Sequence, residues 1–407
     1  MKGNFSHYRW VMAFLAWLML FGLGLSWLSF APMMLKVMEE LSITFEEAGI
    51  IIALVPLALV MLCIPSGLLA DRVGFKRTVL MGATIMSCFG LLRGFSTDFA
   101  TLAITMFACG AGYAVSYPAV TKLIGVWFPP SEIAFATGIA FSGMEVGLSA
   151  AMVLTPIFLA WNGSWRSTFI VIGILTLTIT FVWILLAKDL QKSGVHLSEL
   201  GLEKSGTPSF KRPFTSAVTN RYIWLLALIA FFLLSSQIGF LGFFPSVLEL
   251  RGIDPNMAGI IASMVTWFMI PGSLIVPKAS DRIGVRKPFF WAESMAAGVA
   301  LYFAGTTVGL PLWISIMVYG FLSGGMAALA LSSTIELAGP LHAATASGLF
   351  LVVGYLGATI GPWLVGLLAS TTGSFHMSII VCAALTEAIV VLSLNLRETG
   401  RRSISEF

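Results

Sequence analysis

The sequence predicts an all-α polytopic membrane protein whose twelve transmembrane helices form two pseudo-symmetric six-helix bundles. Its composition is the first observation, because 10% of the 407 residues are charged and 58% are hydrophobic, whereas about 25% of a soluble domain is charged. The second is a series of long apolar stretches, and the third is a pattern that occurs twice along the chain. A chain this apolar cannot cover a surface that faces water, so lipid must surround it.

Twelve apolar stretches lie near the length of about 20 residues that a helix needs to cross a bilayer. Those of the first half are residues 10–35, 48–70, 78–92, 99–127, 133–160 and 167–187. Those of the second half are residues 222–248, 257–276, 289–308, 310–337, 343–370 and 375–396. The first stretch is too long for the core of a signal peptide and has no cleavage site of small residues, so we expect it to remain as a span.

The distribution of lysine and arginine predicts the orientation of the chain. If the N-terminus is cytoplasmic, only Lys36, Arg93, Arg166 and Arg251 of the 23 basic residues lie on the outer side. Basic loops resist translocation, so this bias predicts a protein of the cytoplasmic (inner) membrane with both termini in the cytoplasm. The net charge of +4 therefore reflects membrane orientation and does not indicate binding to nucleic acid.

One charged loop occurs twice, 210 residues apart. Residues 67–77 read GLLADRVGFKR and residues 277–287 read PKASDRIGVRK. Each copy lies between long apolar stretches, so each is expected to form a tight turn at a membrane surface. The same offset relates residues 48–51 (AGII) to 258–261 (AGII), and 136–138 (ATG) to 346–348 (ASG). One unit of six spans has therefore been used twice.

This duplicated loop resembles the signature of the major facilitator superfamily, and the resemblance covers the whole chain. It implies two six-helix bundles and a gating role for the loop residues Gly67, Asp71, Arg72, Gly74, Asp281, Arg282 and Gly284. In the family, the aspartate pairs with a neighbouring helix when the inner face is closed, and the basic residues hold the loop at the phospholipid surface. The glycines would permit close packing and a tight turn, although Pro277 replaces the first glycine in the second copy.

The domain organisation follows from the same repeat. We expect residues 1–187 to form the N-terminal bundle and residues 221–407 to form the C-terminal bundle. Residues 188–220 form the longest polar segment, with basic residues and prolines, and we interpret them as a cytoplasmic linker.

Polar residues at mid-depth are the candidates for the substrate cavity, because transporters of this type bind substrate near the bilayer midplane between their repeats. The best candidates on the spans that line the cavity in this family, with one from span eleven, are Gln237, Tyr319, Tyr113, Tyr117, Tyr355 and Ser323. Other polar residues at this depth are Ser26, Ser29, Ser116, Ser235, Ser236 and Thr266. A single serine in a span usually bonds to its own helix, so we expect less of each serine.

Glu145 is the candidate for proton coupling. It lies near the midpoint of span five, where an ionised carboxylate costs several kcal/mol unless it is paired or hydrated. It could take up and release a proton as the cavity alternates between sides, bind a cationic group of the substrate, or serve as a protonated hydrogen-bond donor. Glu387 is also near mid-depth, but span twelve normally packs outside the cavity.

The substrate stays open at this level. No lysine or arginine lies at the centre of a span, since Arg93 and Lys122 are near span ends where their side chains can reach the interface. Nitrate transporters of the superfamily carry arginines deep in the cavity. The pattern at residues 346–357 and 361–362, however, resembles the cyanate-permease branch. Family members that exchange drugs for protons often have Gly-Pro in span five and an arginine in span four near the position of Met106, and this chain has neither.

The sequence predicts a transporter and not an enzyme. It contains no phosphate-binding loop for ATP and no metal-binding motif, and its four cysteines lie in apolar spans as packing residues. We therefore expect no cofactor, a small-molecule substrate with protons as a second partner, and a monomer in the lipid bilayer. The favoured function is secondary active transport of a small organic solute or anion, coupled to protons and directed inward. The alternatives are an efflux antiporter of metabolites or drugs and a membrane sensor without transport activity.

Overall fold

The computed structural model describes residues 2–129, 132–188, 219–339 and 342–399 and is almost entirely helical there. The first half contains α1 (Lys2–Leu28), η1 (Ala31–Met33), α2 (Met34–Leu41), α3 (Phe45–Val73), α4 (Phe75–Leu92), η2 (Arg93–Phe95), α5 (Phe99–Trp127), α6 (Ile133–Asn162) and α7 (Trp165–Leu186). The second half contains α9 (Arg221–Leu250), α10 (Pro255–Ile283), α11 (Lys287–Thr306), α12 (Leu310–Ala338), α13 (Ala343–Thr372) and α14 (His376–Leu394). The predicted linker lies almost wholly outside the described residues.

Twelve long helices therefore occupy the positions predicted from hydropathy. Eleven of those in the described part of the chain are long and apolar enough to cross a membrane. The twelfth, α11, has 20 residues and matches a predicted span, but it carries Glu293 within its apolar run. The short helix α2 and the turn η1 were not predicted as separate elements, because they continue the apolar pattern of α1.

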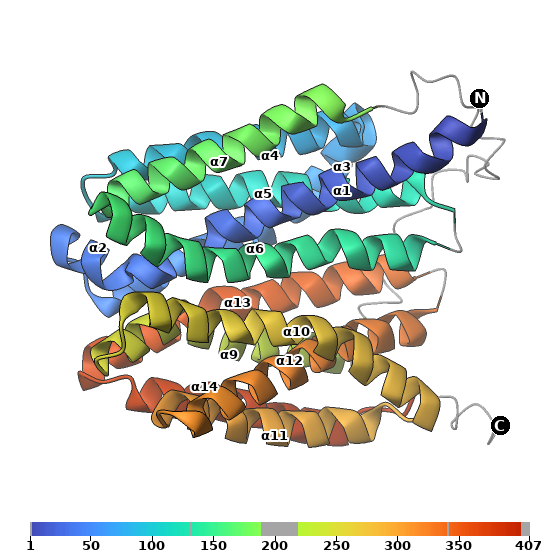
Figure 1. Cartoon of the computed structure of the whole chain (residues 1–407). Coiled ribbons are helices and arrows are strands. Elements are labelled where there is room, and N and C mark those ends of the chain that lie inside the picture. The colour runs from blue at the N-terminus through green and yellow to red at the C-terminus, as the bar shows by residue number, and fades with distance from the viewer. Residues whose placement is uncertain (1, 130–131, 189–218, 340–341, 400–407) are drawn as a thin grey trace.

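The molecule is elongated along its helices, and its two ends differ. The start of α1 lies at one end and α2 lies at the other (Figure 1). The two repeated loops, at the junctions α3–α4 and α10–α11, belong to the same end as the start of α1, which we call the motif end. The opposite end is called the α2 end.

Polar caps fix where helices start at the α2 end. The hydroxyl of Thr44 accepts from the backbone N–H of Glu47, whose carboxylate accepts from the backbone N–H of Thr44 at 2.8 Å, so α3 begins with a capping box. The carboxylate of Asp98 accepts from the backbone N–H of Thr101 at 2.9 Å at the start of α5. Such caps satisfy backbone donors that a helix leaves unpaired.

The pattern of helix packing is repeated in the two halves. In the first half α1 packs against α6, α3 against α5, and α4 against α7. In the second half the equivalent helices pair in the same way, α9 with α13, α10 with α12, and α11 with α14. The two halves are therefore pseudo-symmetric six-helix bundles, as the sequence predicted.

Individual glycine contacts follow the same 210-residue relation. A Cβ on Gly147 of α6 would lie 2.2 Å from the backbone oxygen of Phe21 on α1. A Cβ on Gly357 of α13 would lie 2.0 Å from the backbone oxygen of Phe231 on α9. Only glycine permits backbones to approach this closely.

The seam between the halves is formed by α3 against α13 and by α6 against α10. Near the α2 end, a Cβ on Gly49 would lie 2.4 Å from the backbone oxygen of Pro362. At the symmetric position, a Cβ on Gly259 would lie 2.2 Å from the backbone oxygen of Met152. The helices of the two halves are thus in backbone contact at this level.

The seam is closed toward the α2 end and open toward the motif end. At the α2 end, Ser370 accepts from the backbone N–H of Glu46 at 3.0 Å, and the indole N–H of Trp363 donates to the Glu46 carboxylate at 3.2 Å. Toward the motif end, Gly138 of α6 and Gly348 of α13 face open space. Access to the centre of the molecule therefore lies on the motif side.

Candidate functional site

The central site is a group of aromatic rings and one carboxyl at mid-depth on the seam. It consists of Trp27 (α1), Tyr113 and Tyr117 (α5), Phe141 and Glu145 (α6), and Tyr355 (α13). The hydroxyls of Tyr113 and Tyr355 are 3.0 Å apart, and this hydrogen bond joins the two halves. The ring of Trp27 lies 5.9 Å from that of Tyr113 and 6.5 Å from that of Tyr355.

Helical spacing explains why these side chains meet. Tyr113 and Tyr117 are four residues apart, as are Phe141 and Glu145, so each pair lies on one face of its helix. The ring of Tyr117 contacts that of Tyr113 at 5.4 Å and that of Phe141 at 5.2 Å, both edge to face. Tyr113, Tyr117 and Phe141 therefore form a continuous series of ring contacts, and Phe141 shares its helix face with Glu145.

The Glu145 carboxyl is left without a counter-charge. Its Oε2 atom is buried and has no hydrogen-bond partner in the described structure. The carboxyl lies within electrostatic range of the hydroxyls of Tyr113, Tyr117 and Tyr355. The side chain as a whole is half-buried.

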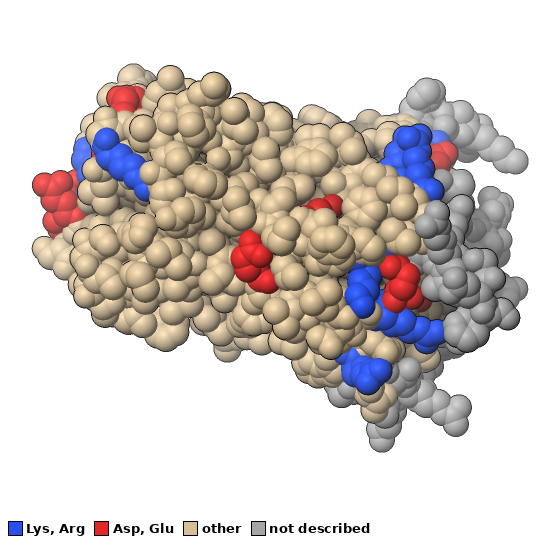
Figure 2. All heavy atoms as spheres, turned by 90° about the horizontal axis from the view of Figure 1, so that it is seen from below, with Lys and Arg blue, Asp and Glu red and all other residues tan. Residues whose placement is uncertain are grey.

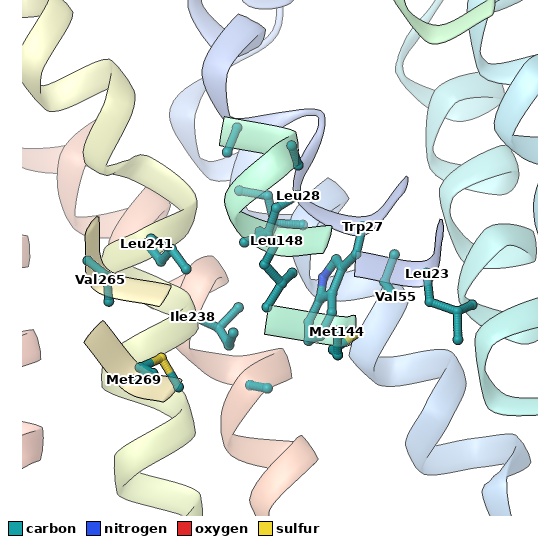
Figure 3. Packing of buried hydrophobic residues seen from close by; sticks show 14 of the residues in the cluster. Leu23, Trp27, Leu28, Val55, Met144, Leu148, Ile238, Leu241, Val265 and Met269 are labelled. Carbon is teal, nitrogen blue, oxygen red and sulfur yellow. The ribbon is translucent and has the colours of Figure 1, made fainter. Parts of the chain in front are cut away.

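Apolar packing closes the central site toward the α2 end. Trp27 and Met144 lie side by side, and Leu148 of the first half lies across the seam from Ile238 of the second (Figure 3). The indole N–H of Trp27 is buried without a partner among the described residues. A polar donor and the Glu145 carboxyl oxygen are thus both unsatisfied in this part of the seam.

Three predicted cavity residues lie in the second half, away from this group. The amide nitrogen of Gln237 is 2.9 Å from the Met269 sulfur, and its buried Oε1 has no partner among the described residues. Tyr319 is 1% exposed and packs against Phe240. Ser323 donates to a backbone oxygen of its own helix, so it offers little to a ligand. The structure therefore brings Glu145 together with the predicted tyrosines of the central site. Gln237, Tyr319 and Ser323 are not part of this group.

Two of the serines at mid-depth make contacts elsewhere in the molecule. Ser236 donates to the backbone oxygen of Cys382 at 2.8 Å and lies 2.8 Å from the hydroxyl of Thr386, so it faces α14. Ser26 faces Arg93 inside the first bundle. The low expectation placed on each serine agrees with these contacts, because depth along a span says nothing about which face of the helix a residue occupies.

Arg93 was predicted to reach the interface, and this prediction is wrong. The residue is 0% exposed, and its guanidinium donates to the backbone oxygen of Ser26 at 2.9 Å and to the Ser26 hydroxyl at 2.8 Å. The guanidinium also lies 4.5 Å from the ring centre of Phe169 and 3.3 Å from the sulfur of Met106. A buried cation is tolerated here because backbone oxygens at the end of α1 and an aromatic face replace water.

The first repeated loop forms an ion pair within its own half. Asp71 accepts from Lys122 of α5 at 2.8 Å, so Lys122 is also held by a partner and does not simply extend to the interface. Arg72 is exposed. Gly74 has a φ of 88°, which explains the glycine at this turn. Gly67 faces open space, so the close packing expected of it is absent in this conformation.

The second repeated loop is held by a denser set of charges. Arg286 donates to Asp281 and to Glu336 of α12, each at 2.6 Å. Gly284 has a φ of 81°, and Arg282 is exposed. The two loops thus each tie the first helix of a packed pair, α3 or α10, to its partner, α5 or α12.

A further carboxyl at mid-depth was not predicted. Glu293 of α11 is 6% exposed, and its Oε2 atom has no partner in the described part of the chain. Glu387 of α14 faces α11, because a Cβ on Gly298 would lie 2.4 Å from its Oε1 atom. On the face shown in Figure 2, lysine and arginine gather near the two ends, whereas acidic side chains also occur midway. Both glutamates lie outside the seam. Glu293 was not selected from the sequence, because apart from its place in an apolar run no feature of the sequence marks it.

The described residues contain no group of three histidine, cysteine, aspartate or glutamate side chains that could hold a metal ion. The four cysteines are free. Chemistry at the central site is therefore limited to proton exchange at a carboxyl, hydrogen bonding by phenols, and contact with aromatic faces.

Two pseudo-symmetric six-helix bundles that meet at a mid-depth site are typical of membrane transporters. The family model of the Major Facilitator Superfamily matches residues 16–362 and 237–406, and the chain belongs to this superfamily. It is a multi-pass membrane protein that transports a small molecule and is not an enzyme.

Known relatives and solved structures agree with this assignment. A "Probable sulfoacetate transporter" of Cupriavidus necator is 25% identical over 384 residues, which cover 88% of this chain and 86% of the relative. The "Hexuronate transporter" of Bacillus subtilis is 23% identical over 367 residues, which cover 86% and 85%. A bacterial homologue of the human lysosomal transporter Spinster, in an inward-facing and unoccupied conformation, superimposes with a TM-score of 0.75 at 17% identity over 95% of each chain.

Proposed function

We propose that the protein is a proton-coupled secondary transporter that imports a small organic solute across the cytoplasmic membrane. Glu145 carries the coupling proton, and residues 1–187 and 221–407 rock about the central site as two bundles joined by the segment 188–220. The motif end faces the cytoplasm, with both termini, and the chain works as a monomer. The observation that carries the proposal is a carboxyl at the seam whose buried oxygen has no partner.

The coupling follows from the cost of charge in this position. An ionised carboxylate without a partner is unfavourable at mid-membrane. Protonation neutralises it, so the free energy of the conformational change depends on whether Glu145 carries a proton. The repeated loops around Asp71 and Asp281 act as the gate, because they lie at the motif end, where the two bundles must approach each other, and each holds two helices of its own bundle together.

The efflux antiporter remains the second candidate, and one observation favours it. Glu145 is the only acidic side chain of the central site, so a proton and a cationic solute would compete for it. Such competition couples the two movements, so that the proton and the solute cross the membrane in opposite directions. The sign of the proton movement therefore separates import with protons from exchange against them.

The test is transport in proteoliposomes loaded with a pH-sensitive dye. Candidate solutes include sulfoacetate and hexuronates, the substrates in the names of the relatives, together with uncharged and cationic organic solutes. We expect solute addition to move protons in the same direction as the solute. The Glu145→Gln variant should lose accumulation driven by a pH gradient and keep counterflow exchange. If the pH dependence survives in that variant, Glu145 is a structural hydrogen-bond donor and the proposal fails.

A further inference from the structure

The central site contains an acceptor of positive charge and several aromatic faces, but no lysine or arginine that would pair with an anion. Its only ionisable groups besides Glu145 are the phenols of Tyr113, Tyr117 and Tyr355. Arg93 does not supply a positive charge to the seam, because it is fully buried and its guanidinium is bonded to Ser26. A carboxylate substrate would therefore enter a site whose one ionisable acid repels it.

Aromatic faces in this arrangement suit an organic cation. Trp27 and Tyr355 approach from opposite halves of the molecule, and Tyr117 and Phe141 line the side nearest Glu145. Ring faces attract ammonium groups through their quadrupoles, and tryptophan attracts them most strongly. Sets of such rings recognise quaternary and methylated ammonium groups.

We propose that the solute carried by this transporter bears an ammonium group, which pairs with the Glu145 carboxylate beside the aromatic rings of the central site. This inference rests on the transport activity and on the proton site at Glu145 in the proposed function, and it names the substrate class. Because an ammonium group and a proton exclude each other at one carboxyl, it selects exchange of the solute against protons, the second candidate above. It departs from the organic acids of the relatives, whose recognition calls for a basic group in the site.

An inside-negative membrane potential favours entry of a cation, so its export requires the opposing movement of protons. Since the Glu145 carboxyl binds either the ammonium group or a proton, the affinity for the solute falls as the proton concentration rises. Around α6, the basic and acidic residues of α1, α5, α7 and α10 lie toward the helix ends, and the other titratable groups at this level are the three phenols and the Cys63 thiol.

The test is ligand binding to the full chain in lipid nanodiscs, measured as thermal stabilisation. The probes are choline, its uncharged carbon analogue dimethylbutanol, and galactarate as a dianion. We expect choline to stabilise the protein, and dimethylbutanol and galactarate not to. Choline affinity should fall in mildly acidic buffer, and the fall should be absent in Glu145→Gln.

Four variants locate the ligand. Glu145→Gln and Trp27→Leu should each weaken choline binding by about tenfold or more, because each removes an electrostatic contact. Trp27→Phe retains a ring and should weaken it less. Glu387→Gln is the matched control, since it changes a mid-depth glutamate that faces α11, and it should leave choline binding unchanged.

Stabilisation by galactarate without stabilisation by choline would overturn the inference, and so would equal choline affinity in the wild type and Glu145→Gln. Proton movement coupled to an organic acid would retain the proposed function while removing the inference. Choline binding at Glu145 without any coupled proton movement would support the inference and contradict the proposed function.

Discussion

The glycine contacts at the seam provide a direct test of how the α2 end closes. In Gly49→Ala, the new Cβ would lie 2.4 Å from the backbone oxygen of Pro362, about 1 Å closer than ordinary van der Waals contact at 3.4 Å. A backbone oxygen cannot rotate away as a side chain can, so α3 and α13 must separate. Overpacking of this size costs about 1–3 kcal/mol. Only the conformation with the α2 end closed bears this cost, so its population relative to the open form should fall by about 5- to 150-fold.

Distances across the α2 end measure this shift. Spin labels are attached at Glu39 on α2 and at Thr371 on α13, which are exposed and lie in opposite halves. The exposed Cys88 is replaced by serine so that it is not labelled. We expect a longer distance to gain population in Gly49→Ala and, by symmetry, in Gly259→Ala. Gly125→Ala is the control, because a Cβ there meets nothing within 4 Å. An unchanged distance distribution in Gly49→Ala would refute the assignment of this contact as the closing surface.

Two further predictions concern charged residues. Asp71→Asn should strongly reduce transport and leave substrate binding and membrane insertion largely intact, since an exposed ion pair contributes only about 0–1 kcal/mol to stability; unchanged uptake in proteoliposomes would remove the gating role. Arg93→Lys should lower the free energy of unfolding by about 1.5–3 kcal/mol, because a lysine cannot make all the buried hydrogen bonds of the guanidinium. Its check is thermal unfolding in detergent, and a melting temperature equal to that of the wild type would contradict the prediction.

The fold could be predicted because its signals are periodic and repeated. Hydropathy located the twelve helices, since each must bury its backbone within lipid. The 210-residue offset anticipated symmetric contacts that hydropathy cannot show, such as Gly147 on Phe21 and Gly357 on Phe231. These two glycines, which are identical at the offset, make equivalent contacts in the two halves.

The candidate site was predicted only in part. Glu145 was evident because a carboxyl in a long apolar stretch is rare, and the tyrosines followed from depth. Trp27 could not be selected, because an aromatic residue in an apolar span resembles every other packing residue. Arg93 was misjudged because its place near the end of a span does not reveal whether it points to lipid headgroups or into the bundle. Such directions depend on how neighbouring helices pack, and that is a tertiary property.

Arg93 also has a counterpart in the second half, with the roles of the two helices exchanged. In the first half, the arginine follows α4 and binds the Ser26 carbonyl near the end of α1. In the second half, Arg251 follows α9, the equivalent of α1, and donates to the carbonyls of Gly305 and Thr307 at the end of α11, the equivalent of α4. Arg93 is fully buried, whereas Arg251 is exposed. Dissolved ions screen exposed charges far more than buried ones, so high ionic strength should affect the contacts of Arg251 more than those of Arg93.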